Sequence, residues 1–171
     1  MNVMRCVAMS VFSSVLCACS GNGGVTDDSL TVNSVGNSAA VNSTGNSAAV
    51  TELEVSGDSR DFSFAVTVTS PDLGCSQYAD WWEVIRPDGS LVYRRILTHS
   101  HVDEQPFTRS GGPVAISADE EVIVRVHMNN LNYSEQVYTG SVSQGFSAAT
   151  LDAAFAQTLE FVEPLPDGCA F

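Results

Sequence analysis

Hydrophobic residues alternate with polar ones along several short stretches of this chain, and this period of two restricts the fold more than any other feature. In 61–69, DFSFAVTVT, phenylalanine or valine occupies every second position, with serine, alanine and threonine between them. In 122–128, VIVRVHM, the valines and Met128 share one face, and Arg125 and His127 share the other. Successive strand residues point to opposite faces, so each stretch predicts a half-buried β-strand.

Further strands are expected on either side. The β-branched and aromatic runs 79–87 and 90–97 are joined by Asp88 and Gly89, which are typical of hairpin turns. Weaker strand patterns occur near 51–57 and 135–143. About six short strands in roughly a hundred residues are typical of an antiparallel immunoglobulin-like or fibronectin-like β-sandwich. We therefore expect residues 51–171 to form one all-β sandwich domain.

The stretch 147–161, SAATLDAAFAQTLEF, predicts a short C-terminal helix. Ser147 suits the N-cap, and Leu151, Phe155 and Leu159 recur every four residues. Such a helix would cover an open part of the sheet. Trp81 and Trp82 are adjacent, so only one of them can face the core. The other would lie under this helix or form an exposed platform for a ligand.

The N-terminus has the organisation of an export signal. Arg5 precedes a mostly apolar run that ends at Ala18, and this run is shorter than the ~20 residues a membrane-spanning helix needs. The run closes with Leu16-Cys17-Ala18-Cys19, which resembles the lipobox of bacterial lipoproteins. Cys17 departs from the commoner Ala, Ser or Thr at its position, although it is also small.

The resemblance implies that residues 1–18 are a signal peptide and that Cys19 is lipidated and begins the mature chain. It also implies a lipid-anchored cell-envelope protein. Because Ser20 and not aspartate follows the cysteine, the family's sorting pattern implies the outer membrane in a cell that has one. The alternative is an ordinary secretory signal cut after Ala18, which would leave Cys19 as a free thiol.

Residues 19–50 are rich in Ser, Asn, Gly and Ala and contain a tandem nine-residue repeat, VNSVGNSAA followed by VNSTGNSAA. The segment has no aromatic residue and few charges, so it has little apolar surface with which to offset the entropy cost of ordering. Two copies are too few to stack as a solenoid. We predict a disordered tether that holds the domain clear of the membrane.

The five cysteines divide according to this processing. Cys6 and Cys17 leave with the signal peptide and Cys19 carries lipid, so Cys75 and Cys169 remain in an oxidising compartment. We predict a disulfide between them. The alternative is a pair of metal-binding thiolates, which is disfavoured because no C-x-x-C spacing is present.

The charge balance excludes one class of partner. Seven arginines and no lysine stand against 20 acidic residues, for a net charge of −13. No basic patch is available to displace counterions from phosphates, so we expect no nucleic-acid partner. The acidity either keeps the domain soluble or captures cations.

The three histidines are the strongest chemical signal. His99 and His101 would leave the same face of an extended chain, and His127 lies on the outward face of a strand that could be their neighbour. Three imidazoles with Glu104 as a fourth ligand would suit zinc or copper. Alternatively, 97–112 is a long polar loop with hydrogen-bonded or solvated histidines, or one histidine is a general base beside a carboxylate.

Two partial resemblances accompany this pattern. His99-x-His101 with the later His127 resembles the metal ligands of the alpha carbonic anhydrases, although this domain is about half their size. His99, His101, Glu104 and Gly111 also resemble the first cupin motif, with the spacing from His101 to Glu104 one residue short. Both resemblances imply metal binding at these histidines.

The sequence lacks the G-x-S-x-G nucleophile context and any phosphate-binding glycine loop. We therefore expect a lipid-anchored envelope lipoprotein that presents a non-catalytic binding or structural module. Its partner would be a protein, a glycan or a metal. The alternative is an envelope protein that binds zinc or copper through the three-histidine site.

Overall fold

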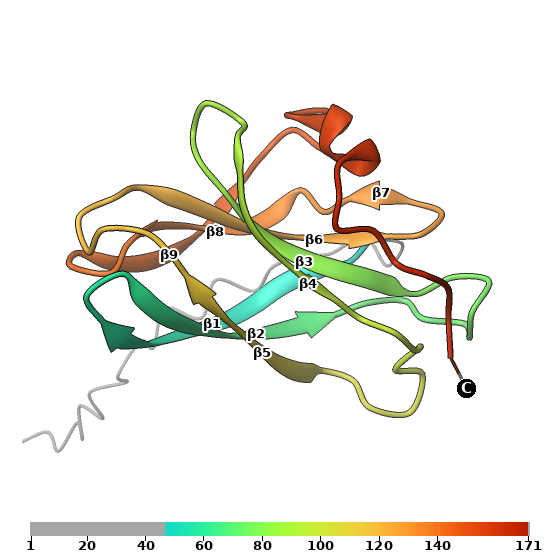
Figure 1. The fold of residues 1–171 in the computed structure, drawn as a ribbon. Coiled ribbons are helices and arrows are strands. Elements are labelled where there is room, and N and C mark those ends of the chain that lie inside the picture. The colour runs from blue at the N-terminus through green and yellow to red at the C-terminus, as the bar shows by residue number, and fades with distance from the viewer. Residues whose placement is uncertain (1–46, 171) are drawn as a thin grey trace, which may run out of the picture. The chain divides into compact units, whose positions relative to one another are not determined.

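The computed structural model describes residues 47–170, which fold into nine strands and one short 3₁₀ helix (Figure 1). The all-β class predicted from the alternation is confirmed. The bounds are β1 Ala49–Asp58, β2 Asp61–Thr69, β3 Ala79–Ile85, β4 Leu91–Ile96, β5 Phe107–Val114, β6 Val122–Met128, β7 Asn132–Tyr133, β8 Gln136–Ser141, β9 Gly145–Thr150 and η1 Gln157–Phe161.

The strands belong to one sheet in the order β4-β3-β6-β8-β1-β2-β5, with β7 paired to β6 and β9 to β8. Most pairs are antiparallel, but β1 and β8 run parallel where Ala49 lies opposite Gln136. The sheet curls until its end strands approach each other, and Arg95 of β4 donates from Nε to the Ser110 carbonyl oxygen of β5 at 3.2 Å (Figure 1). The pairing is therefore that of a single mixed, nearly closed barrel-like sheet, in contrast to the two antiparallel sheets of the expected sandwich.

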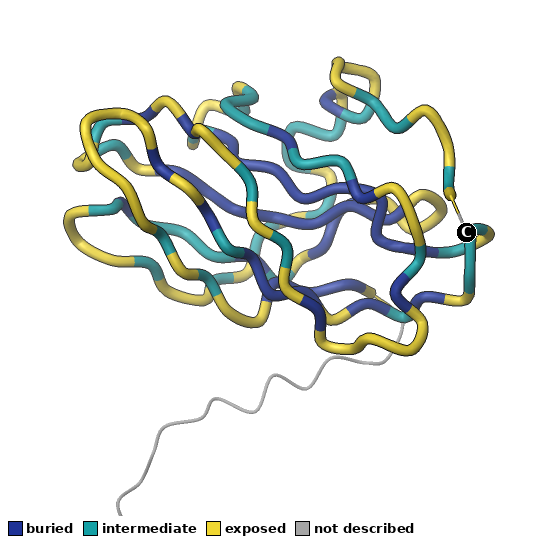
Figure 2. The backbone as a smooth tube through the Cα atoms, turned by 60° about the horizontal axis from the view of Figure 1, so that its bottom comes forward, coloured by how far each residue is buried: buried dark blue, intermediate teal, exposed yellow. Residues whose placement is uncertain are grey.

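The main core fills the inside of this curled sheet (Figure 2). The inward residues of 61–69 and 122–128 are those that the alternation predicts, and Phe64, Val66 and Val124 are fully buried. Trp82 is the large aromatic of this core. Gly111 of β5 lies so close to it that a Cβ would come within 2.9 Å of the indole, so a residue without a side chain is needed where β5 meets β4.

A second hydrophobic cluster lies on the outer face of β3 and β6. Trp81 is its largest member, and it is covered by the C-terminal segment, residues 151–170, as the sequence allowed. Every residue of β3 and of β6 is consequently buried. The other fully packed members of the cluster are Ile85, Ile123, Tyr133, Val137 and Leu159.

The helix predicted for 147–161 is wrong. Residues Gly145–Thr150 pair with β8 as strand β9, which takes up hydrogen bonds that a helix would have made internally. The chain then turns through Ala156, whose φ of 48° is left-handed, before the short η1. Leu151, Phe155 and Leu159 still face the sheet and pack into the second cluster, but from an irregular segment.

Two arginines hold this segment by its backbone. Arg94 of β4 and Arg125 of β6 flank Glu83 of β3, at 2.6 Å and 2.7 Å, and all three side chains are fully buried. Their remaining N–H groups donate to backbone carbonyls of the C-terminal segment, which satisfies groups that a helix would have satisfied itself. The accepting carbonyls are those of Phe155, Ala156, Leu159, Val162 and Pro164.

The predicted disulfide is present: Cys75 and Cys169 are bonded, with their Cα atoms 5.6 Å apart. The backbone N–H of Ala170 donates to the Thr98 carbonyl oxygen at 2.6 Å, so Cys169 and Ala170 are fixed against two loops. Strand β1 begins at Ala49, within the segment expected to be tether. The signal peptide, Cys19 and the rest of the tether to residue 46 lie outside the described residues.

Candidate functional site

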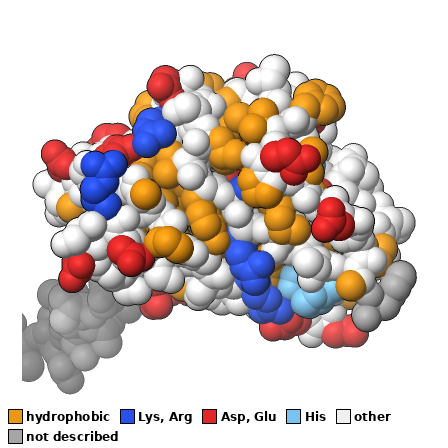
Figure 3. Space-filling model, in the orientation of Figure 1, with side chains coloured by type: hydrophobic (Ala, Val, Ile, Leu, Met, Phe, Trp, Pro, Cys, Tyr) orange, Lys and Arg blue, Asp and Glu red, His pale blue; other side chains and the backbone are white. Residues whose placement is uncertain are grey.

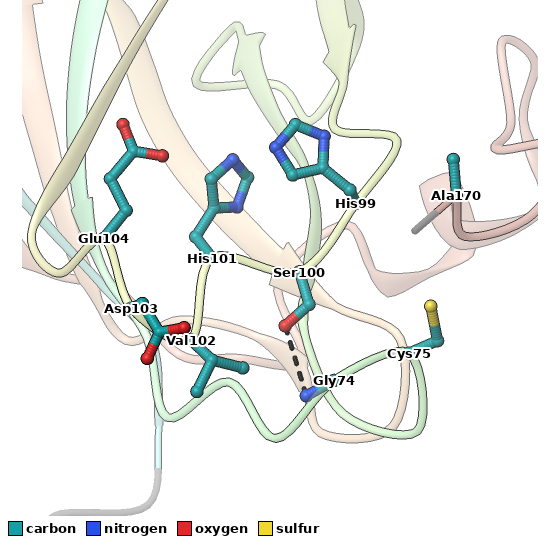
Figure 4. Close-up of a pocket in the computed structure, with 9 residues that line it drawn as sticks. All are labelled: Gly74, Cys75, His99, Ser100, His101, Val102, Asp103, Glu104 and Ala170. Carbon is teal, nitrogen blue, oxygen red and sulfur yellow. Dashed lines mark hydrogen bonds between the residues drawn. The ribbon is translucent and has the colours of Figure 1, made fainter.

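One end of the domain carries a hollow formed by three segments distant in sequence (Figure 4). The first residue of β1, Ala49, pairs with the last residue of β2, Thr69, so the loop after β2 lies at the same end of the sheet as the start of β1. The loop between β4 and β5 and the end of the C-terminal segment complete the hollow. Its volume is about 420 Å³, and its lining residues are Gly74, Cys75, His99, Ser100, His101, Val102, Asp103, Glu104 and Ala170.

Asp72 holds together the loops at this end of the domain through hydrogen bonds to its carboxylate. One carboxylate oxygen accepts from the Ala79 N–H at 3.1 Å and from the Ser70 hydroxyl at 2.6 Å. The other accepts from the His101 N–H at 2.7 Å and the Ser100 hydroxyl at 3.3 Å. Hydrogen bonds to a buried carboxylate are among the stronger ones in proteins. Asp72 therefore fixes the histidine loop to the loop after β2.

His101 is the most unusual side chain of the hollow. Its ring is 1 % exposed and stacks on Phe107, with ring centroids 3.7 Å apart. Neither ring nitrogen has a hydrogen-bond partner among the described residues, since the nearest Asp72 oxygen is 3.9 Å from Nδ1. Burial lowers the pKa of His101, and the charge of Arg109 lowers it further. Both effects favour the neutral form of the ring.

His99, Asp103 and Glu104 form the exposed rim. The rings of His99 and His101 lie side by side with centroids 4.5 Å apart (Figure 4). Glu104 is paired with Arg109 at 2.8 Å, and the hydrogen bond from that guanidinium lowers the pKa of the carboxyl. The space-filling view shows histidine surface at this end, between arginine and carboxylate side chains (Figure 3). The rim therefore combines imidazole and ionised carboxylate.

His127 is not part of this constellation. It stacks on Trp81 with centroids 3.7 Å apart, and its Nδ1 lies 2.7 Å from an Asp80 carboxylate oxygen. It is buried in the outer face of β6, beside Tyr133. Within residues 47–170 no group of three or more His, Cys, Asp or Glu side chains is arranged to hold a metal ion. The structure thus places His99 beside His101 and puts Glu104 on the rim of the same hollow, where it pairs with Arg109, and it separates His127 from them.

Comparison with known proteins finds one informative relative. A protein of Halomicrobium mukohataei named "Putative lipoprotein" is 34% identical over 94 residues, which are 55% of this chain and 46% of that protein. The chain thus spans about half the length of the curated relative it matches. No family model matches the chain, and no solved structure matches it. None of the helices in the described part is both long and apolar enough to cross a membrane.

Sequence reasoning missed two residues of this end. Asp72 follows Ser70-Pro71 in a loop, and nothing in that context distinguishes it from a solvated turn residue. Phe107 begins β5, where the nearby Gly111 and Gly112 suggested a loop. Strand β2 pairs with β1 on one edge and with β5 on the other. The sequence does not show that β2 needs a partner on its second edge, so it gave no reason to expect a strand at Phe107.

Proposed function

We propose that this chain is a lipid-anchored cell-envelope protein whose anchor is attached to Cys19. The observation that carries the proposal is the sequence Leu16-Cys17-Ala18-Cys19 at the end of a short apolar run. The relative named as a lipoprotein supports it over about half of each chain. That relative is archaeal and gives no support to the outer-membrane placement that Ser20 implies, so the proposal is confined to envelope anchoring.

Detergent phase partitioning tests the anchor. The wild-type protein should enter the detergent phase of Triton X-114, and its N-terminal peptide should begin at Cys19 with added lipid mass. Cys19→Ser should move the protein to the aqueous phase. Cys17→Ser is the matched control, because it changes a neighbouring cysteine to a residue common at that position and should keep the detergent partitioning. A wild-type protein in the aqueous phase would refute the anchor.

We further propose that the anchored domain is a non-catalytic binding module whose ligand occupies the hollow. A volume of about 420 Å³ falls within the range of small-molecule sites. The hollow lies on loops that are fixed by the Asp72 hydrogen bonds and by the disulfide, and such fixed loops are common carriers of binding sites.

Thermal-shift measurements test the binding module on the full-length protein in detergent. The ligand panel would contain divalent cations, amines, oligosaccharides and short peptides. At least one class should raise Tm in a saturable way. Ala170→Trp, which places a large side chain at the hollow, should abolish that shift, and Ala115→Trp on an exposed loop beyond β5 should keep it. No shift with any class, or a shift that Ala170→Trp retains, would refute this half of the proposal.

A further inference from the structure

We infer that the domain binds a small oxyanion, such as the carboxylate group of a ligand, in a cavity formed by Arg95, His99, His101 and Arg109. This cavity adjoins the hollow, because His99 and His101 line both. The inference rests on the proposed binding module and names the chemical group by which that module recognises its ligand.

The cavity lies where the curled sheet nearly closes. Arg95, near the end of β4, donates from Nε to the Ser110 carbonyl oxygen of β5, which brings it to the strand that carries Arg109. The volume is about 40 Å³, and Ile96, Leu97 and Thr98 complete the lining. A single water molecule needs roughly 10–15 Å³ of such volume. The cavity therefore suits a carboxylate head, and the body of a larger ligand would extend into the hollow.

Arg95 brings a positive charge that no carboxylate neutralises within residues 47–170. Its Nε and Nη1 donate to the backbone carbonyls of Ser110 and Ile96, and its Nη2 makes no hydrogen bond in that part of the chain. Four other arginines are each paired with a glutamate, namely Arg86, Arg94, Arg109 and Arg125. A guanidinium with unused N–H groups is the side chain best suited to binding a carboxylate.

The unpartnered ring of His101 is an independent indication of a ligand at this cavity. The side chain is 1 % exposed, yet neither ring nitrogen has a hydrogen-bond partner among the described residues, whereas buried polar atoms nearly always have one. The neutral ring keeps one N–H donor, which an oxyanion would accept. His99, exposed and with its ring centroid 4.5 Å away, can rotate to admit the ligand, because exposed side chains change rotamer rapidly.

The nearby carboxylates leave the cavity open to an anion. Glu104 is paired with Arg109, and the Asp72 oxygens accept hydrogen bonds from four donors. The Asp103 carboxylate points away from the two imidazoles (Figure 4). Exposed charges more than about 8 Å away are largely screened at physiological salt, so the net charge of −13 does not prevent local binding.

Isothermal titration calorimetry on the full-length protein in detergent tests the inference. The probes are acetate, sulfate and the pair glucuronate and glucose, which have nearly the same shape but differ in charge. At least one oxyanion should bind saturably at one site per chain, and glucuronate should bind at least about tenfold more tightly than glucose. Acetate against sulfate distinguishes a planar carboxylate from a tetrahedral anion.

Arg95→Gln should weaken oxyanion binding at least about tenfold, because it removes the charge and the guanidinium donors. Arg86→Gln is the matched control, since Arg86 is another partly exposed arginine and is already paired with Glu120; it should bind like the wild type. If Arg95→Gln does not fold, Arg95→Lys takes its place: it keeps the charge but loses the planar fork, so its affinity for carboxylate should still fall.

Nitrogen-15 NMR of the imidazoles provides a second readout. A bound oxyanion should shift the ring resonances of His101 and leave those of His127, which binds Asp80 in the outer cluster, unchanged. Three results would overturn the inference: no saturable oxyanion binding, glucose binding as tightly as glucuronate, or affinity unaltered in the Arg95 variants. A neutral ligand whose thermal shift is lost in Ala170→Trp would still preserve the binding module, and detergent partitioning would preserve the anchor.

Discussion

Replacing Glu83 by glutamine should destabilise the domain more than any surface substitution. The Glu83 carboxylate lies between Arg94 and Arg125, and all three side chains are shielded from solvent. The amide has nearly the same shape but no charge, and its nitrogen is a donor facing another donor. Glu83→Gln therefore leaves two buried cations without a counter-charge.

The expected size follows from that burial. Breaking a buried ion pair by removing one partner costs about 3–5 kcal/mol, because the remaining charge is uncompensated. The C-terminal segment depends on the same arginines through its carbonyls, so the loss should reach the whole outer face of β3 and β6. For a domain of this size, a loss of this order corresponds to a fall in Tm of roughly 10–20 °C.

Urea unfolding of the full-length protein, followed by the fluorescence of buried Trp81 and Trp82, measures this effect. The matched control is Glu120→Gln, which removes a partly exposed carboxylate from Arg86 at 2.8 Å and should cost less than about 1 kcal/mol. If Glu83→Gln lost no more free energy of unfolding than Glu120→Gln, the C-terminal segment would not be held by the arginines, and the reasoning would fail.

Three further outcomes follow from the structure. Burial and the nearby Glu83 raise the pKa of Tyr133 above its usual 10.0, so the contribution of the neutral phenol to stability is complete below pH 10 and is lost as pH rises. The free energy of unfolding, measured with urea, should therefore fall less steeply between pH 10 and about 11.5 in Tyr133→Phe than in the wild type. Equal slopes would contradict this. Reducing the Cys75–Cys169 bond opens a loop of 94 residues and should lower stability by about 4–5 kcal/mol, seen as a lower urea midpoint; an unchanged midpoint would show that the bond adds little. Gly111→Ala brings a Cβ to 2.6 Å from the Tyr93 hydroxyl and should lower Tm through a cost of about 1–3 kcal/mol, whereas an unaltered Tm would mean that β4 and β5 separate freely.

The strands that could be predicted from the sequence are those with one solvent-exposed face. Strand β2 buries Phe64 and Val66 while its alternate residues stay more exposed, and its period of two is visible for that reason. In β3, by contrast, Trp81 and Trp82 are both buried, one on each face, so no period of two is visible in the sequence, which does not reveal what covers the outer side. Closure of the sheet depends on the approach of β5 to β4, which local pattern does not encode.

The C-terminal error has a different cause. Ala, Leu and Gln favour helix locally, and the spacing of Leu151, Phe155 and Leu159 fits one. The backbone groups of this stretch instead pair with the free edge of β8 and accept hydrogen bonds from the two buried arginines, and these partners outweigh the internal hydrogen bonds of a helix. Tertiary hydrogen-bond partners of this kind lie far away in the sequence, so local propensity alone cannot anticipate them.

For the candidate site, adjacency in sequence was informative and strand register was not. His99 and His101 are two residues apart and remain neighbours in any loop. Whether His127 joins them depends on which residue of β3 it faces, and the register sets it opposite Trp81, where Asp80 binds it. A shared outward face is a necessary condition for a common ligand and not a sufficient one.

The position of Ala170 beside the hollow has a practical consequence for labelling this protein. Ala170 lines the hollow and its N–H donates to the Thr98 carbonyl oxygen, so a label attached at position 170 would occupy the proposed binding site. The β1–β2 hairpin around Asp58–Asp61 is exposed and joins those strands at the ends remote from the Ala49–Thr69 pair. A reporter inserted there would leave the opening of the hollow unobstructed.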